Sequence, residues 1–313
     1  MVPGLPPLSP HSPEAHAIFG LWNETLGVCA VIFALVVGLV AYCVVRFRAR
    51  GPHAPGSPEP PQIHGHKRLE IAWTAAPFVV VMVLFELTAR TMGASDPPPM
   101  REPDLVVTGH QWWWEARYPS GVVTANEIHV PAGKDLLVRI ESADVIHDFW
   151  VPELGRKIDA TPGHPTFLTV QADAPGTYLG TCAEYCGVQH AWMRIVVVAE
   201  EQAAFDAWQR KQLEPAPPPA SREAARGAVL FRDRTCVKCH AITGLGEGAR
   251  AAPDLTHLAS RATLGAGVLG NTKDTLTGWL KDPQLYKPGS HMPSLRLTDD
   301  ETQALVAYFE ELR

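Results

Sequence analysis

The pattern of apolar and polar positions changes three times along this chain. Residues 26–45 are an apolar run without a charge, and as a helix such a run reaches roughly 30 Å and crosses the core of a bilayer. A second apolar run, residues 71–85, carries Pro77 and is short for a span on its own. We expect a transmembrane hairpin over 26–92 after an N-terminal segment over 1–25. A buried helix of a soluble domain is the alternative for the second run.

Basic residues gather between the two apolar runs. This interval contains Arg46, Arg48, Arg50, Lys67 and Arg68, whereas no Lys or Arg precedes the first run. Because positive charge next to membrane spans favours the cytoplasmic side, we expect this loop in the cytoplasm of a bacterium. The N-terminus and everything after Arg90 would then lie outside, in a two-pass protein of the cytoplasmic membrane. A lipid on Cys29 is an alternative that its local sequence does not favour.

Short stretches rich in Val, Ile, Thr and aromatic residues follow, separated by Gly, Pro and Asp. They predict a small all-β sandwich or barrel over 101–200. A short helical stretch and the proline-rich "EPAPPPAS" predict a linker over 201–221. The pattern from 222 to 313 is helical and ends in an amphipathic helix with Thr298 as its expected cap.

Composition excludes one class of partner and directs attention to the cysteines. A formal net charge of −6 gives no reason to expect nucleic acid. Cys29 and Cys43 lie in the first apolar run, and the other four cysteines form two close pairs, each with a histidine nearby. Such pairs indicate ligand or attachment sites rather than a disulfide framework.

The first pair lies in "CAEYCGVQHAWM", which contains Cys182, Cys186, His190 and Met193. Thiolates with a thioether favour copper, whereas zinc would have little use for the methionine. Two cysteines allow two thiolates to bridge two copper ions, which then need a second histidine and one more weak ligand. His147 is the natural second histidine, and a backbone carbonyl between the cysteines could be the weak ligand. A disulfide between the two cysteines is the alternative.

The second pair lies in "CVKCH", the pattern of covalent c-type haem attachment. The motif contains Cys236, Cys239 and His240. The cysteines would form thioethers with the haem, and the histidine would bind iron. Met292 is the only methionine after this motif and is the expected sixth ligand, which would raise the reduction potential. His291 and His257 remain alternatives, and a zinc site is weaker because no second CxxC follows.

Together, "VIHDFWVPELGRKIDATPG", "CAEYCGVQHAWM" and "GHQWWWEARY" resemble subunit II of the haem-copper cytochrome c oxidases over residues 15 to about 210. The C-terminal segment resembles an all-α class I cytochrome c domain. The resemblance implies a cupredoxin-like Greek-key barrel with a binuclear CuA centre. In it Cys182 and Cys186 would bridge the coppers, His147 and His190 would bind one each, and Met193 and the carbonyl of Glu184 would be weak ligands.

Further roles are implied by the same resemblance. The Glu184 side chain and Asp159 would lie near a magnesium ion shared with subunit I, although a solvated carboxylate is the alternative for Glu184. Trp112 would be the surface ring through which electrons enter CuA, with packing as its alternative. Glu70 would lie at the mouth of a proton channel, or would be only a first-turn carboxylate favoured by the helix dipole. Trp113 stands where the family often has tyrosine.

These features predict an electron-input subunit of a membrane terminal oxidase. Electrons from an external donor, such as a cytochrome c or a quinol–cytochrome c reductase, would pass through haem c to CuA and on to haem in subunit I. Oxygen reduction and proton translocation would belong to subunit I, because both spans lack histidine; subunit III is a further expected partner. The alternatives are a CuA-type nitric oxide reductase and a copper-delivery chaperone, but such chaperones have one span and a thioredoxin-like pattern.

Overall fold

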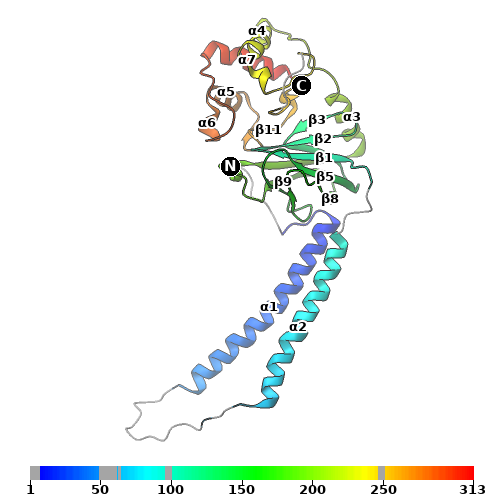
Figure 1. Cartoon of the computed structure of the whole chain (residues 1–313), viewed down its shortest axis with the longest axis vertical. Coiled ribbons are helices and arrows are strands. Elements are labelled where there is room, and N and C mark those ends of the chain that lie inside the picture. The colour runs from blue at the N-terminus through cyan, green and yellow to red at the C-terminus, as the bar shows by residue number, and fades with distance from the viewer. Residues whose placement is uncertain (1–7, 49–61, 63–64, 96–100, 246–250) are drawn as a thin grey trace, which may run out of the picture. The chain divides into compact units, whose positions relative to one another are not determined.

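The chain folds into two compact units. A computed structural model describes residues 8–48, 62, 65–95, 101–245 and 251–313. One unit is Ala17–Ser95, and the other joins Met1–His16 to Asp96–Arg313. Figure 1 shows that the first unit is built of helices, while the second contains the sheets and the remaining helices. Most of the expected cytoplasmic loop, including Arg50, lies outside the described residues.

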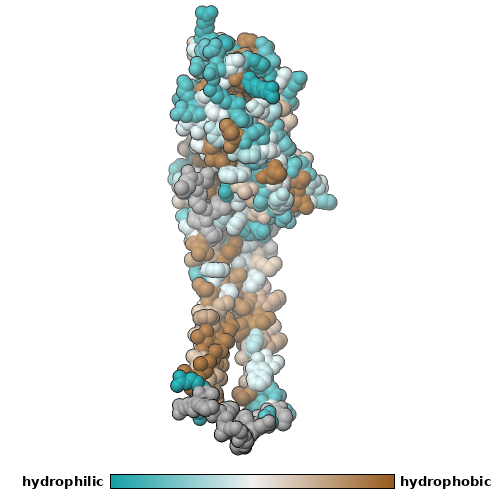
Figure 2. All heavy atoms as spheres, turned by 90° about the vertical axis from the view of Figure 1, so that its left-hand side faces the viewer, coloured by the Kyte–Doolittle hydropathy of each residue, from teal (hydrophilic) through white to brown (hydrophobic). Residues whose placement is uncertain are grey.

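Two long helices form the first unit. Helix α1 is Pro13–Arg46 and helix α2 is Lys67–Ser95. Both are long and apolar enough to cross a membrane, and the most apolar window of each is 0% buried. Figure 2 shows apolar side chains along the surface of both helices. A helix that is apolar on all sides needs apolar surroundings. A membrane provides them, as expected for a transmembrane hairpin.

Helix α1 begins at Pro13, well before the first residue of the expected span. The hydroxyl of Ser12 accepts a hydrogen bond from the amide of Ala15 at 3.0 Å, and Pro13 occupies the first turn, where its missing N–H costs nothing. Apolar periodicity alone could not place this start, because the polar residues up to Glu24 conceal the continuing helix.

Ten strands form the β domain. Their bounds are β1 Leu105–His110, β2 Trp113–Arg117, β3 Val123–Ala125, β4 Glu127–Pro131, β5 Leu136–Ser142, β6 His147–Trp150, β7 Ile158–Ala160, β8 Thr166–Val170, β9 Gly176–Cys182 and β10 Arg194–Glu200. They make two five-stranded sheets, in the orders β3-β2-β1-β5-β8 and β4-β10-β9-β6-β7. Most pairs are antiparallel, but β1 with β5 and β4 with β10 are parallel. The result is the predicted cupredoxin-like β domain.

The core of the β domain extends to the expected copper ligands. Alternate residues of β1 are buried, as a strand with one inner face requires. Trp114, Ile140 and Ile195 are fully buried in one apolar cluster that also contains Cys182 and Met193. The sulfur ligands therefore belong to the packed interior, and their positions are determined by the core.

Helices make up most of the rest of the second unit. Their bounds are α3 Gln202–Gln212, α4 Arg222–Asp233, α5 Lys273–Lys281, α6 Pro283–Tyr286 and α7 Asp299–Glu311. Short 3-10 turns add η1 His190–Trp192, η2 Cys236–Lys238 and η3 Leu258–Ser260. The cap predicted at Thr298 is confirmed, because Thr298 and Glu301 form a reciprocal capping box. A small ribbon, β11 Thr263–Leu264 with β12 Leu269–Gly270, was not predicted.

Helices α4 and α7 pack closely at Gly227. A Cβ atom built on Gly227 would lie only 2.7 Å from the carbonyl carbon of Ala304 and from Cβ of Tyr308. Without a side chain at Gly227 the two helices can approach closely, and Phe231 then packs against Phe309 with ring centroids 6.0 Å apart. This crossing is the framework of the helical domain.

Candidate metal centre and haem pocket

The predicted copper ligands meet where two strands end at the same edge of a sheet. His147 opens β6 and Cys182 ends β9, and these strands pair antiparallel. The donor atoms of His147, Cys182 and Cys186 lie within 4.8 Å of one another, and all three residues are buried. Among the described residues, this is the only group of three or more His, Cys, Asp or Glu side chains close enough to share an ion.

Cys182 is at the centre of one half of this cluster. Its Sγ lies 3.8 Å from Sγ of Cys186 and 3.9 Å from Nδ1 of His147. The thiol also donates to the carbonyl oxygen of Glu184 at 3.2 Å. A disulfide would bring the two sulfurs to about 2.05 Å, whereas both cysteines are free here.

Cys186 is at the centre of the other half. Its Sγ lies 3.8 Å from Nδ1 of His190 and 3.9 Å from Sδ of Met193. Tetrahedral ligands at about 2.0–2.3 Å from an ion lie about 3.3–3.8 Å apart, so these spacings need little change to hold metal. Two thiols, two imidazoles and a thioether are donors that suit copper. The residues present therefore fit a copper centre.

The pKa values of the two thiols are shifted in opposite directions. The hydrogen bond that Cys182 shares with Cys186 and its contact with His147 lower the pKa of Cys182, although burial opposes this shift. The neighbouring Cys182 and burial raise the pKa of Cys186. One thiolate is thus available before any cation arrives, and the second proton would leave when a cation replaces it.

Asp144 orients the histidine of this cluster. Nε2 of His147 donates to Oδ1 of Asp144 at 2.7 Å, so Nδ1 faces the sulfurs. Burial opposes a charge on His147, but the hydrogen bonds to Asp144 and Cys182 outweigh it and raise the pKa of the ring. A carboxylate behind a metal-binding histidine fixes its ring and tautomer. Asp144 was not predicted from the sequence, although its place three residues before His147 in "DVIH" was a usable signal.

The opposite side of His147 is closed by a glycine and a tryptophan. A Cβ at Gly109 would lie 2.8 Å from Cδ2 of His147, so the ring occupies space that only glycine leaves. Trp114 meets the same ring edge-on, with centroids 5.8 Å apart. Packing and the Asp144 hydrogen bond together hold the imidazole in one orientation.

Trp112 lies beside the cluster and is covered. Its Nε1 donates to the carbonyl oxygen of Cys186 at 2.9 Å, and Nε2 of Gln111 donates to the same oxygen at 2.8 Å. The expected surface position is wrong for this chain, because Trp112 is only 8% exposed. The ring of His291, from the helical domain, lies over it at a centroid distance of 4.8 Å.

The carboxylates expected near magnesium do not form a cluster of their own in the described part of the chain. Glu184 and Asp159 are both exposed. Asp159 pairs in register with the buried Asp148 across β6 and β7. Burial and the nearby Asp159 raise the pKa of Asp148 to about 7. An ion here would need ligands from another chain.

Glu70 lies in the first turn of α2 and is exposed. Its Oε1 accepts a hydrogen bond from the amide of His66 at 3.1 Å. This is the contact of a carboxylate at a helix N-terminus, so the geometry accounts for Glu70 without a channel.

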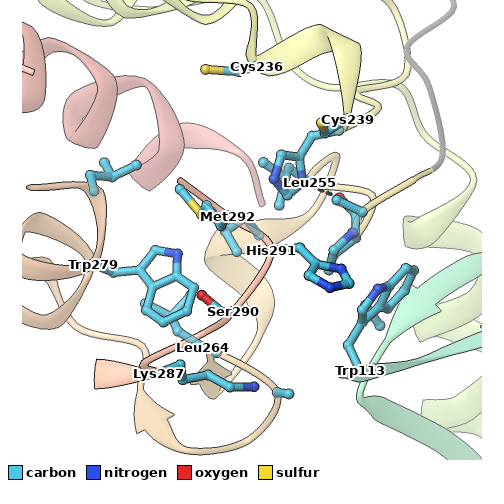
Figure 3. A pocket seen from close by; sticks show the side chains of 18 of the residues that line it. Trp113, Cys236, Cys239, Leu255, Leu264, Trp279, Lys287, Ser290, His291 and Met292 are labelled. Atoms are coloured by element: carbon cyan, nitrogen blue, oxygen red, sulfur yellow. Dashed lines mark hydrogen bonds between the residues drawn. The ribbon is translucent and has the colours of Figure 1, made fainter. Parts of the chain in front are cut away.

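The predicted haem residues line one cavity. Cys236, Cys239, His240 and Met292 all border a space of about 430 Å³ whose lining is mainly apolar. Figure 3 shows the two cysteines on one side of this space and Met292 on another. Nδ1 of His240 donates to the carbonyl oxygen of Pro253 at 2.7 Å, which leaves Nε2 for iron. The residues therefore fit a covalently attached haem.

The two alternative axial ligands are occupied elsewhere. Nε2 of His257 lies 3.1 Å from the carbonyl oxygen of Glu214, and His257 is not among the residues that line the cavity. His291 borders the cavity, but its ring packs on Trp112. Met292 is therefore better placed than either histidine.

Three protein-family models match the chain. Residues 8–87 match "Cytochrome C oxidase subunit II, transmembrane domain", residues 120–200 match "Cytochrome C oxidase subunit II, periplasmic domain", and residues 224–313 match "Cytochrome c". The chain is thus a membrane protein with a periplasmic domain and a cytochrome c domain.

Individual relatives agree with these matches. Cytochrome c oxidase subunit 2 of Alkalihalophilus pseudofirmus is 33% identical over 315 residues, covering 98% of this chain and 90% of that protein. Cytochrome c oxidase subunit 2 of Bacillus subtilis is 33% identical over 293 residues, covering 87% and 82%. The solved periplasmic domain of cytochrome oxidase subunit II from Bradyrhizobium japonicum is 32% identical, covers 36% of this chain and 95% of that domain, and has a TM-score of 0.35.

A transmembrane domain, a β domain and a cytochrome c domain are matched in this order along nearly the whole chain. The chain therefore belongs to the cytochrome c oxidase subunit II family, and it is an oxidoreductase subunit with a cytochrome c domain at its C-terminal end.

Proposed function

We propose that this chain is the electron-input subunit of a membrane terminal oxidase. It would accept electrons from an external donor at haem c and pass them by way of CuA to haem in subunit I, where oxygen is reduced to water and protons are translocated. When bound, the haem and the copper pair supply one-electron chemistry at a covered site. The residues of this chain bind and orient both groups.

One observation carries the proposal: the donors for two redox centres lie in one compact unit and meet at Trp112. Trp112 contacts Cys186 through its indole N–H and His291 through its ring. A metal store or a delivery protein has no need of a second redox group beside the first. A chain that moves electrons between two centres does.

We assign the ligands by their place in these clusters. Cys182 and Cys186 would bridge two coppers, with His147 and His190 binding one each and Met193 and the carbonyl of Glu184 as weak ligands. Donor spacings of 3.2–3.9 Å support this set. In the haem domain, Cys236 and Cys239 would form the thioethers. His240 and Met292 would then bind iron from the wall of the same cavity.

The membrane side follows from charge. The basic residues between the helices would lie in the cytoplasm, and the N-terminus, the β domain and the haem domain would lie outside. The proposal includes these limits: an N-terminal segment over 1–25, a transmembrane hairpin over 26–92, the β domain over 101–200, a linker over 201–221 and the haem domain over 222–313.

Contacts with other subunits complete the proposal. As an oxidase subunit II, the chain works with subunit I. A magnesium ion between them would use Glu184 and Asp159, whose exposed carboxylates remain available to a partner. Subunit III and an external donor, such as a cytochrome c or a quinol–cytochrome c reductase, are further proposed partners. Glu70 at a proton-channel mouth is the part of the proposal that the chain itself supports least, because its hydrogen bond to His66 already explains it.

The test is gas consumption by the purified complex. The solubilised complex, isolated by a tag on this chain and supplied with a chemical reductant, would be offered oxygen and nitric oxide separately. We expect rapid, cyanide-sensitive oxygen uptake and slow nitric oxide turnover. The reverse preference would move the complex to the CuA-type nitric oxide reductases and leave the metal assignments unchanged.

A further inference from the structure

A buried lysine of the haem domain is held by the β domain. Lys287 is 4% exposed, and its Nζ donates to the carbonyl oxygens of Trp112 at 3.3 Å and Trp192 at 3.2 Å. No carboxylate pairs with it among the ion pairs of the described residues. Burial lowers the pKa of Lys287 to about 8, so the ammonium is still mainly charged at neutral pH. Figure 3 shows Lys287 beneath Ser290 in the loop that carries His291.

A buried carboxylate makes the reciprocal contact. Glu127, at the start of β4, is 4% exposed. It accepts hydrogen bonds from the amides of Ala262 at 3.1 Å and Thr263 at 2.7 Å, and from the Thr263 hydroxyl at 2.6 Å. Each domain thus inserts one charged side chain into the other. The partners of both charges are main-chain groups, with the Thr263 hydroxyl in addition at Glu127.

Neutral contacts lie between these two anchors. The amide of Arg194 donates to the carbonyl oxygen of Ala266 at 3.1 Å, and Trp113 packs with Ala125 and Ala266 in a small apolar cluster. The side-chain amide of Gln189 donates to the carbonyl oxygen of Pro288. Pro288 lies three residues before His291, whose ring contacts Trp112. The interface therefore combines a small apolar contact and neutral hydrogen bonds with the two charged anchors.

The two charges make sense only in the docked arrangement. A buried ion loses several kcal/mol of hydration, and good hydrogen bonds must replace it. If the haem domain swung freely on its linker, both ions would be in water and the chain would have no need to form pockets for them. Because both pockets form in the same docked arrangement, they favour one fixed position of the haem domain over many transient ones.

The docked arrangement brings together the groups that separate the two redox sites. Met292 adjoins His291, whose ring lies on Trp112, and Trp112 bonds to the carbonyl of Cys186. Nζ of Lys287 donates a hydrogen bond to the carbonyl oxygen of the same Trp112. Moving the lysine would therefore move the haem-side loop relative to the copper-side ring.

We propose that Lys287 and Glu127 fasten the haem domain to the β domain in one fixed position, and that Lys287 is the positioning residue which holds His291 on Trp112. The docking itself is independent of what the complex reduces. Its effect on electron transfer rests on the proposed function.

The test uses the intact complex with haem and copper bound. The variants are Lys287→Met, which keeps the apolar stem, and Glu127→Gln, which keeps the shape of the carboxylate. Lys273→Met and Glu223→Gln are matched controls. Both side chains are exposed and form ion pairs on the surface, Lys273 with Glu310 and Glu223 with Arg226. Unchanged haem and copper absorption spectra show that each variant is folded and loaded.

Hydrogen exchange gives the first measurement. We expect amides of residues 262–266 and of the turn before Arg194 to exchange about tenfold faster in both variants, with no change in the controls. The second measurement is the rate of electron transfer from haem c to copper after flash reduction, which we expect to fall by about tenfold in Lys287→Met. Protection equal to that of the controls in both variants would overturn the fixed docking.

The two measurements separate this inference from the proposed function. Faster exchange with an unchanged transfer rate would refute the positioning role of Lys287. A complex that prefers nitric oxide would change the proposed function, while the exchange result would still decide the docking.

Discussion

The indole N–H of Trp112 is bonded to the main chain of Cys186, with Nε1 2.9 Å from the carbonyl oxygen. An aromatic ring covered by the haem domain is thereby joined to a residue whose sulfur lies in the copper cluster. This relationship makes Trp112 a link between two sites within one chain, rather than a landing point on an open surface.

Trp112→Phe should slow electron transfer from haem c to copper. Phenylalanine keeps a ring in the space but cannot donate to Cys186, so the contact with the copper side is weakened. We expect a drop of about tenfold or more in the transfer rate after flash reduction, with little change in the copper spectrum. Trp208→Phe is the matched control, because Trp208 packs on His129 in a different part of the β domain. A rate equal to that of the control would remove Trp112 from the path.

Cys186→Ser should abolish the binuclear centre. Serine cannot supply the second thiolate, and Cys186 is the residue whose sulfur contacts Cys182, His190 and Met193. Electron paramagnetic resonance should lose the signal of an electron shared over two coppers, and the copper content should fall, while the haem stays attached. Cys43→Ser in α1 is the control. A persisting shared signal would refute the bridging role.

Met193→Leu should shift the reduction potential of copper and leave the haem unchanged. Leucine nearly preserves the volume of this fully buried side chain and removes the thioether, so the loss of stability should stay below about 1.5 kcal/mol. Redox titration followed by the copper bands measures the shift, and Met82→Leu in α2 is the control. Unchanged copper spectra, potential and transfer rate would count against Met193 as a ligand.

Gly227→Ala should destabilise the haem domain. The new methyl group would collide with the Ala304 carbonyl in the crossing of α4 and α7, and such overpacking costs roughly 1–3 kcal/mol. Thermal unfolding followed by the haem absorption band should begin at a lower temperature. Gly270→Ala is the control, because no atom lies within 4 Å of its added Cβ. Equal unfolding of the two variants would show that the crossing can relax.

The sequence allowed the copper and haem residues to be predicted because they lie in compact motifs. Cys182 to Met193 and Cys236 to His240 are each close along the chain, so their chemistry can be recognised before any fold is known. His147 could be added because the centre needed a second histidine. The structure gathers these side chains as expected, although which ions they bind remains a proposal.

Long-range contacts could not be predicted in the same way. Lys287 and Trp112 are separated by 175 positions, and nothing in the pattern around Lys287 distinguishes it from a solvated lysine. The burial of Trp112 and the role of Asp144 depend on how strands and domains meet. The start of α1 at Pro13 was not predicted, because the Ser12 side chain caps the helix through a local hydrogen bond that hydropathy does not detect.

The insertion of Lys287 and Glu127, each into the other domain, also affects how the sequence of this chain can change in evolution. The partners of Lys287 and Glu127 are mostly main-chain groups, at Trp112, Trp192, Ala262 and Thr263. Almost any residue carries these groups, and only proline at 262 or 263 would remove a donor. The hydrogen bonds of this docking therefore survive changes of side chain at Trp192, Ala262 and Thr263, whereas Trp112 is constrained by its own contact with Cys186. Lys287 and Glu127 cannot be replaced one at a time without leaving their hydrogen-bond partners unpaired.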